Sequence, residues 1–301
     1  MLKFKLLGTA AGGGIPQWNC ACQLCHLSRT HPQISPPRLQ LQAAFSADVQ
    51  GWTLINASPD LRFQIEANPE LQPSPSRGRR NTPIQNIILT SADLDQVLGL
   101  LLLREFQPLH VYATPLVRQL LDDNSFFRML QRVPDQLTWT PIIPGIPFHP
   151  APGIRCTAKS LIASLPFYAK DLDITAPRHI SLGLVIESEG RRVAYTPSLP
   201  EITGELLEIY DSCDVVLIDG TFWSDAELSN THAGTPLARS IGHIPMSGED
   251  GTIARLAQVT SPKKIFVHIN NTNPVLDPRS AEYKQVIDAG WQIGQDGWQL
   301  N

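Results

Sequence analysis

The chain lacks the long apolar stretches and the charge blocks that mark several large classes of protein. Among its 301 residues, no uninterrupted apolar run approaches the roughly 20 residues that a membrane-spanning helix needs, so no membrane partner is expected. The first residues show no long apolar segment with a small-residue cleavage site, and we therefore expect a cytoplasmic location. The net charge is −4 and the longest basic cluster is Arg77, Arg79 and Arg80, which argues against nucleic acid as a partner.

Internal repeats, heptad patterns and a composition typical of disorder are also lacking. With 42% hydrophobic residues, a chain of this length can bury a substantial core. We expect one globular domain over residues 1–301, with two smaller domains as the alternative.

Short strand-like segments and helical patterns alternate irregularly along the chain. Strands are predicted at residues 3–7, 52–56, 86–90, 110–113, 182–187, 192–196, 215–219 and 264–268. Helices are predicted at residues 93–106, 115–122, 201–209, 248–259 and 279–289. The turn at 188–190 indicates a hairpin, and the proline-rich stretches 72–83 and 134–152 indicate long surface loops. An α/β layered fold with a mixed sheet follows.

Three of the five cysteines lie close together, at Cys20, Cys22 and Cys25. Three thiolates on one short loop can wrap a single tetrahedral Zn²⁺ if a fourth ligand comes from elsewhere. His26 is adjacent but awkwardly placed, so His243, in a distant loop-like segment, is the better candidate. We expect a structural zinc here, and three metal-free thiols are the alternative.

Three apolar strands end on residues that can bind a metal ion. Asp93 and Asp95 follow the first of these strands, Asp219 ends the second, and His268 ends the third. Strand ends of this kind converge on the binding sites of α/β sheets. A cluster of the four side chains would suit Fe²⁺, Mn²⁺ or Zn²⁺. Asp93 and Asp95 also stand where a helix begins, so helix capping is the alternative role for one of them.

Five blocks of sequence, at residues 8–20, 56–60, 90–96, 99–105 and 268–274, follow one another along the chain. In these blocks and their order the chain resembles the PqqB family of pyrroloquinoline quinone (PQQ) biosynthesis, a branch of the metallo-β-lactamase superfamily. The resemblance implies a single metallo-β-lactamase-like domain, a four-layer αββα sandwich with mixed β-sheets. It also implies a structural zinc on Cys20, Cys22 and Cys25, completed by a histidine in the region of His243.

The superfamily's first metal motif, His-x-His-x-Asp-His, is only partly present. Ser91 and Asp93 replace its first two histidines, and Gln96 replaces its last. The middle histidine is not evident between residues 154 and 182. Because an amide is a weak neutral ligand, Gln96 should lower metal affinity. Most of the histidines that a two-metal hydrolase site needs are therefore missing. Ser91 and Gln96 are further candidate ligands of the second metal.

The resemblance implies that the substrate is the peptide-derived, cross-linked Glu–Tyr precursor of PQQ. Our leading hypothesis is an iron- and oxygen-dependent hydroxylase of the tyrosine ring, with Fe(II) on the catalytic residues Asp93, Asp95 and His268, and possible help from Asp219. The alternatives are a non-catalytic carrier of PQQ or its precursor and, ranked lower, a metal-dependent hydrolase or phosphodiesterase. Other pathway proteins and a second copy of the chain stay open as partners. Candidate substrate contacts are Glu105, Asn270, Asn271 and Asn273.

Overall fold

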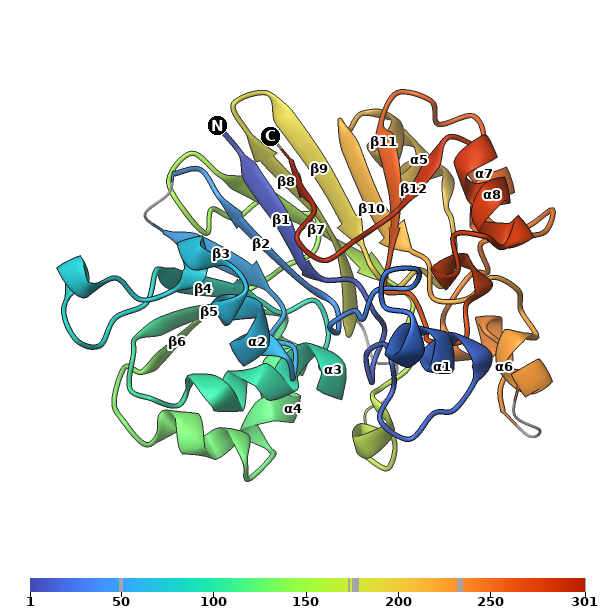
Figure 1. Cartoon of the computed structure of the whole chain (residues 1–301). Coiled ribbons are helices and arrows are strands. Elements are labelled where there is room, and N and C mark those ends of the chain that lie inside the picture. Colours follow the sequence, from blue (N-terminus) through green and yellow to red (C-terminus); the bar gives the residue numbers. More distant parts are fainter. Residues whose placement is uncertain (49–50, 173, 175–178, 232–234, 301) are drawn as a thin grey trace. The chain divides into compact units, whose positions relative to one another are not determined.

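The structure, a computed structural model, describes residues 1–48, 51–172, 174, 179–231 and 235–300 (Figure 1). The chain divides into two compact units. Unit 1 comprises Met1–Gly8, Leu41–Arg191 and Gly297–Asn301, and unit 2 comprises Thr9–Gln40 and Arg192–Asp296. The expectation that residues 1–301 behave as a single domain stays a prediction.

Unit 1 is built on a seven-stranded mixed sheet with the order β13-β1-β2-β3-β4-β5-β6. Its strands are antiparallel from β13 to β3 and parallel from β3 to β6. An antiparallel pair, β7 and β8, also belongs to this unit. The strands are β1 (Lys3–Gly8), β2 (Gln42–Ser46), β3 (Trp52–Ile55), β4 (Ile84–Ile88), β5 (Leu109–Ala113), β6 (Leu137–Pro141), β7 (Arg155–Leu161), β8 (Ser181–Ser188) and β13 (Gln299–Leu300).

Helices α2, α3 and α4 lie along one side of strands β3 to β6 in unit 1 (Figure 1). The core between them includes Leu54, Ile87 and Val111 from the sheet and Leu61 and Val117 from the helices, all fully buried. The helical segments are α2 (Leu61–Glu66), α3 (Leu94–Val97) and α4 (Pro115–Asp122), with 3-10 turns η1 (Pro69–Leu71), η2 (Pro75–Arg77), η3 (Leu98–Leu103), η4 (Phe127–Gln131) and η5 (Phe167–Ala169).

Unit 2 contains four parallel strands in the order β12-β11-β10-β9. Asp219, at the end of β10, pairs with Val267 of β11, so the following residue, His268, leaves the sheet at the same edge. The strands are β9 (Arg191–Thr196), β10 (Val215–Asp219), β11 (Lys263–Val267) and β12 (Trp291–Ile293). The helical segments are α1 (Gln23–Thr30), α5 (Gly204–Asp211), α6 (Glu227–Thr231), η6 (Arg239–Ile241), α7 (Thr252–Arg255), η7 (Pro274–Leu276) and α8 (Ala281–Asp288), and Figure 1 shows α7 and α8 on one side of the strands.

All eight predicted strands form, each within two residues of the predicted limits. The helix predicted at 115–122 is confirmed as α4. The segment 93–106 forms two shorter elements, α3 and η3, and within 248–259 only α7 is helical. The prediction of a loop through 134–152 is wrong, because β6 forms there and pairs with β5. β6 went unnoticed because its half-exposed residues show no apolar run. Within the described residues, no helix combines the length and the apolarity needed to cross a membrane.

Candidate metal sites

The three clustered cysteines lie at the start of helix α1 in unit 2. Cys22 is the N-cap of α1, and its Sγ accepts a hydrogen bond from the backbone N–H of Cys25 at 3.5 Å. Cys20 Sγ accepts from the N–H of Cys22, and Cys25 Sγ from the N–H of Gln17, each at 3.4 Å. The three sulfur atoms lie within 4.8 Å of one another. Because N–H groups aimed at sulfur stabilise thiolates, this loop is arranged for a cation such as Zn²⁺.

The thiols of this cluster differ in their readiness to ionise. Partial burial opposes ionisation of Cys20, but hydrogen bonds, first of all from the backbone of Cys22, lower the pKa of its thiol. Burial raises the pKa of Cys22 to about 11, and the charge of Cys25 adds to this shift. Thiolates this close repel one another, and a bound cation removes that repulsion. The donor set therefore fits a metal ion.

Asn271 is the fourth group beside the cysteines. Its side-chain amide nitrogen lies 3.2 Å from Cys20 Sγ and 3.3 Å from Cys25 Sγ. The prediction of His243 as the fourth ligand is wrong, because the Nδ1 atom of that ring lies 2.7 Å from Asp219 in a different cluster. The error arose because a histidine in a loop carries no local signal for which of two clusters it joins.

Asp219, His243 and His268 form a second group of potential ligands in unit 2, with one ligand atom of each within 4.8 Å of the others. Asp219 ends β10, and His268 follows β11 with a left-handed φ of 58°. Such a conformation is unusual for a residue other than glycine and is typical of functional sites. The rings of His243 and His268 stack with their centroids 5.5 Å apart. His243 is thus the residue that the sequence prediction of this site missed.

The hydrogen bonds in this group place a proton on the Nδ1 atom of both rings. An ionised carboxylate only accepts, so His243 must donate its Nδ1–H to Asp219 Oδ2, at 2.7 Å. The hydroxyl of Thr221 donates to Asp219 Oδ1 at 2.6 Å, so its oxygen is free to accept from His268 Nδ1 at 2.8 Å. In the neutral rings, both Nε2 atoms then carry lone pairs. Each ring is oriented as a metal ligand or a proton acceptor.

Asp219 is fully buried and already has four donors. Its Oδ1 accepts from the backbone N–H and hydroxyl of Thr221, and its Oδ2 accepts from the N–H of Leu199 and from His243. Burial alone would raise the pKa of this carboxyl, but the charge and hydrogen bond of His243 hold it below its usual value. A carboxylate has about four lone-pair sites. Asp219 therefore orients the histidines, and it would have to release a donor to bind a metal itself.

The predicted aspartates of unit 1 lie at the start of α3. Asp93 occupies the N-cap position, but its side chain makes no capping hydrogen bond and instead accepts one from Ser91 Oγ at 2.8 Å. Asp95 is in the first turn of the helix. The prediction that these carboxylates share a metal with His268 stays a prediction, as does the role of Ser91, whose hydroxyl proton is directed at Asp93.

Gln96 is buried and belongs to a network of amides and hydroxyls in unit 1. Its Oε1 lies 2.9 Å from Asn56 Nδ2 and 2.8 Å from Thr90 Oγ1. Asn56, at a left-handed φ of 67°, also accepts from the N–H of Thr90 at 2.8 Å. The structure therefore contradicts the prediction of Gln96 as a candidate ligand, because its only lone pairs face these donors. It fixes the loop that leads to Asp93.

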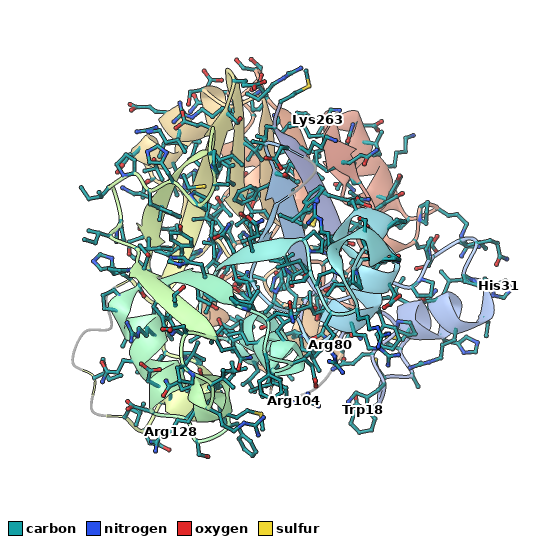
Figure 2. All side chains as sticks on the ribbon, turned by 90° about the vertical axis from the view of Figure 1, so that its left-hand side faces the viewer. Trp18, His31, Arg80, Arg104, Arg128 and Lys263 are labelled. Carbon is teal, nitrogen blue, oxygen red and sulfur yellow. The ribbon has the colours of Figure 1, made fainter. Side chains whose placement is uncertain are left out.

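The predicted substrate contacts have other partners within the units that contain them. Glu105 lies 3.5 Å from Arg80 and 3.7 Å from Arg104, and Figure 2 shows both arginines on the same side of unit 1. Asn271 contacts the thiols. Asn273 is fully buried, donates to Gly220 O at 3.0 Å and caps η7. Asn270 donates to Thr272 Oγ1 at 2.6 Å. Asn271 and Asn273 thus have structural partners, and the role of all four residues as substrate contacts stays a prediction.

Comparison with known proteins defines the class first. A family model described as a beta-lactamase superfamily domain matches residues 51–269. A diphosphatase of the PhnP family has a TM-score of 0.70 at 17% identity, with coverage of 100% of this chain and 98% of that one, which shows a shared fold. The predicted metallo-β-lactamase fold, α/β with mixed sheets, is confirmed.

Curated relatives of much higher identity narrow the class to a family. Coenzyme PQQ synthesis protein B of Methylorubrum extorquens (strain PA1) is 40% identical over 298 residues, which is 98% of each chain. The Methylobacterium radiotolerans relative of the same name is 39% identical over 100% of both chains. The crystal structure of Zn²⁺-bound PqqB from Methylobacterium extorquens matches with a TM-score of 0.93 at 40% identity, over 99% of each chain. The chain belongs to this PqqB family.

Proposed function

We propose that this protein takes part in PQQ biosynthesis in the cytoplasm, as an iron- and oxygen-dependent hydroxylase of the tyrosine ring in the peptide-derived Glu–Tyr precursor. Two lines of support carry the proposal. The full-length relatives are named for PQQ synthesis. The network of Asp219, Thr221, His243 and His268 directs the Nδ1–H of both imidazoles at oxygen acceptors, which orients the Nε2 atom of each ring as the one suited to bind a metal or accept a proton.

The iron ligands in this proposal are Asp93, Asp95 and His268. Many non-haem Fe(II) oxygenases hold iron on two imidazoles and one carboxylate and leave open positions. The proposed set also has three protein ligands, but with one imidazole and two carboxylates. Asp219 acts through Thr221, whose hydroxyl oxygen accepts the Nδ1–H of His268 and so leaves Nε2 as the ligand atom of that ring. Iron, when bound there, supplies the one-electron chemistry that reduction of O₂ requires.

His243 is the proton acceptor of the proposed site. Its side chain is 13% exposed and is therefore reachable by a substrate, and its Nδ1–H is held by the buried carboxylate of Asp219. A carboxylate hydrogen-bonded to one nitrogen of an imidazole orients the ring and stabilises the imidazolium that forms when the opposite nitrogen accepts a proton. The Nε2 atom of His243 can thus take the phenol proton of the substrate. Overall, a ring C–H, O₂, two electrons from an external reductant and two protons give a ring C–OH and water.

The cysteine cluster has a separate, structural role in this proposal. Cys20, Cys22 and Cys25 would hold Zn²⁺, and the side-chain amide of Asn271, in place of His243, would donate hydrogen bonds to two of the sulfur atoms. The Methylobacterium extorquens relative is described as Zn²⁺-bound, which supports a divalent metal in the family. A closed thiolate site stabilises the fold without taking part in chemistry.

The test combines metal counting with isotope labelling. Protein purified anaerobically with added Fe²⁺ should contain one zinc and about one iron per chain, and the Asp95→Ala variant should keep the zinc and lose the iron. With a Glu–Tyr peptide, a reductant and ¹⁸O₂, mass spectrometry should detect one ¹⁸O atom in the tyrosine ring. Zinc without iron, or iron without label in the ring, would contradict the hydroxylase proposal and favour the carrier of PQQ or its precursor.

A further inference from the structure

Turn η5 of unit 1 displays an almost fully exposed aromatic side chain on a firmly anchored backbone. Phe167 is 85% exposed. Two residues on, Ala169 is 1% exposed and belongs to the core cluster of the unit, and Leu165 packs against the same core. Because Ala169 and Leu165 hold the turn against the core, the backbone of the turn keeps the Phe167 side chain on the surface. An exposed aromatic ring held in this way offers a surface on which a ligand ring can pack.

Tyr168 connects this turn to the loop that carries Asp93. Its hydroxyl donates to the carbonyl oxygen of Ala92 at 2.7 Å, across 76 residues of sequence. Burial, with the nearby charge of Asp93, raises the pKa of Tyr168 to about 12, so the hydroxyl remains a donor at neutral pH. Ala92 directly precedes Asp93 in the chain. Turn η5 therefore lies beside a carboxylate that we assign to the metal.

A positive charge accompanies the exposed ring. The Nζ atom of Lys170 lies 4.9 Å from the centroid of the Phe167 ring. Asp171 follows and is also exposed, so the surface carries both signs. An aromatic ring with an ammonium group over it fits a ligand that has both an aromatic ring and a carboxylate, since rings pack together and opposite charges pair.

We propose that Phe167 and Lys170 determine substrate specificity, by binding an aromatic substrate that carries a carboxylate, next to Asp93. Phe167 contacts the aromatic ring and Lys170 pairs with the carboxylate. Tyr168 is a positioning residue that fixes the turn relative to Asp93. The inference rests on the proposed function, because a tyrosine-derived substrate with a glutamate supplies both chemical groups.

Calorimetric binding of the dipeptide Glu-Tyr to the metal-loaded full chain tests the inference. Phe167→Ala and Lys170→Gln should each weaken binding about tenfold and raise KM by a similar factor without changing kcat. The dipeptide Glu-Ala should bind weakly and equally to the wild type and Phe167→Ala. Phe126→Ala is the matched control, since Phe126 is another exposed phenylalanine of unit 1, at 72%. Tyr168→Phe should raise KM while the melting temperature stays unchanged.

The outcomes separate this inference from the proposed function. If the wild type binds Glu-Tyr and both variants bind it equally well, the inference is overturned while the hydroxylase proposal stands. If the variants lose binding and the wild type hydroxylates nothing, the recognition site is supported and the hydroxylase proposal falls. Absence of binding by the wild type at millimolar dipeptide would overturn the inference. A Tyr168→Phe variant with a lowered melting temperature and unchanged KM would make Tyr168 structural only.

Discussion

His243 donates its Nδ1–H to the buried Oδ2 atom of Asp219 over 2.7 Å, although the two residues are 24 positions apart in different elements. The same carboxylate holds Thr221, which in turn accepts from His268. One buried charge therefore controls the tautomer of two imidazoles.

Asp219→Asn should lower the affinity of the second metal by about 10- to 100-fold, because an amide cannot accept all four hydrogen bonds and the rings lose their fixed tautomer. Titration with Fe²⁺ under anaerobic conditions measures the effect. Asp214→Asn, at a carboxylate that accepts from the backbone N–H of Arg192, is the control and should bind Fe²⁺ as the wild type does. Equal affinities for both variants would contradict the orienting role of Asp219.

Glu227 gives the wild type a pH-dependent loss of stability. Burial raises the pKa of this carboxyl from 4.5 to about 7, although Thr272 and the backbone of Trp223 donate to it. The folded state then binds its proton more tightly than the unfolded state does, so stability falls as pH rises from 4.5 to 7 and stays low above that. The loss is on the order of 3 kcal/mol for a shift of this size.

Glu227→Gln mimics the protonated carboxyl and should remove this dependence. Chemical denaturation at pH 5 and pH 8 should therefore give a smaller difference in unfolding free energy for the variant than for the wild type, with the variant more stable at pH 8. An identical pH dependence in both proteins would show that Glu227 titrates normally.

Gln96→Ala should destabilise the protein by about 1–3 kcal/mol, because it removes a buried acceptor that the amide of Asn56 and the hydroxyl of Thr90 share. Urea denaturation measures the free energy of unfolding. Gln119→Ala, at an exposed glutamine of α4, should change it by no more than about 0.5 kcal/mol. If Gln96→Ala is as stable as the wild type but binds less metal, Gln96 acts as a ligand after all.

Cys22→Ser should abolish zinc binding and lower the melting temperature, since structural zinc contributes directly to the free energy of folding. Cys213→Ser alters another thiol of unit 2, which donates to the carbonyl of Ile209 at 3.2 Å, and should keep one zinc per chain. Elemental analysis of both variants decides the question. A zinc content unaffected by Cys22→Ser would place the zinc elsewhere.

The sequence by itself determined the positions of the strands and most of the residues that could form the sites. Strands such as β10 and β11 were predictable because their apolar runs are local signals that survive in the folded chain. The cysteine cluster was equally evident, since its members are separated by only one or two residues. The polar groups at strand ends were evident for the same reason, because they directly follow these apolar runs in the sequence.

Tertiary structure alone decided which of those side chains contact one another. It placed Asn271 against Cys20, 251 residues away, and joined His243 to Asp219 and Gln96 to Asn56. Each of these contacts depends on strand register and on where a loop returns, which no short stretch of sequence encodes. Hydrogen bonding between buried polar groups then selects the partner, because a buried donor or acceptor without one costs about 1–3 kcal/mol.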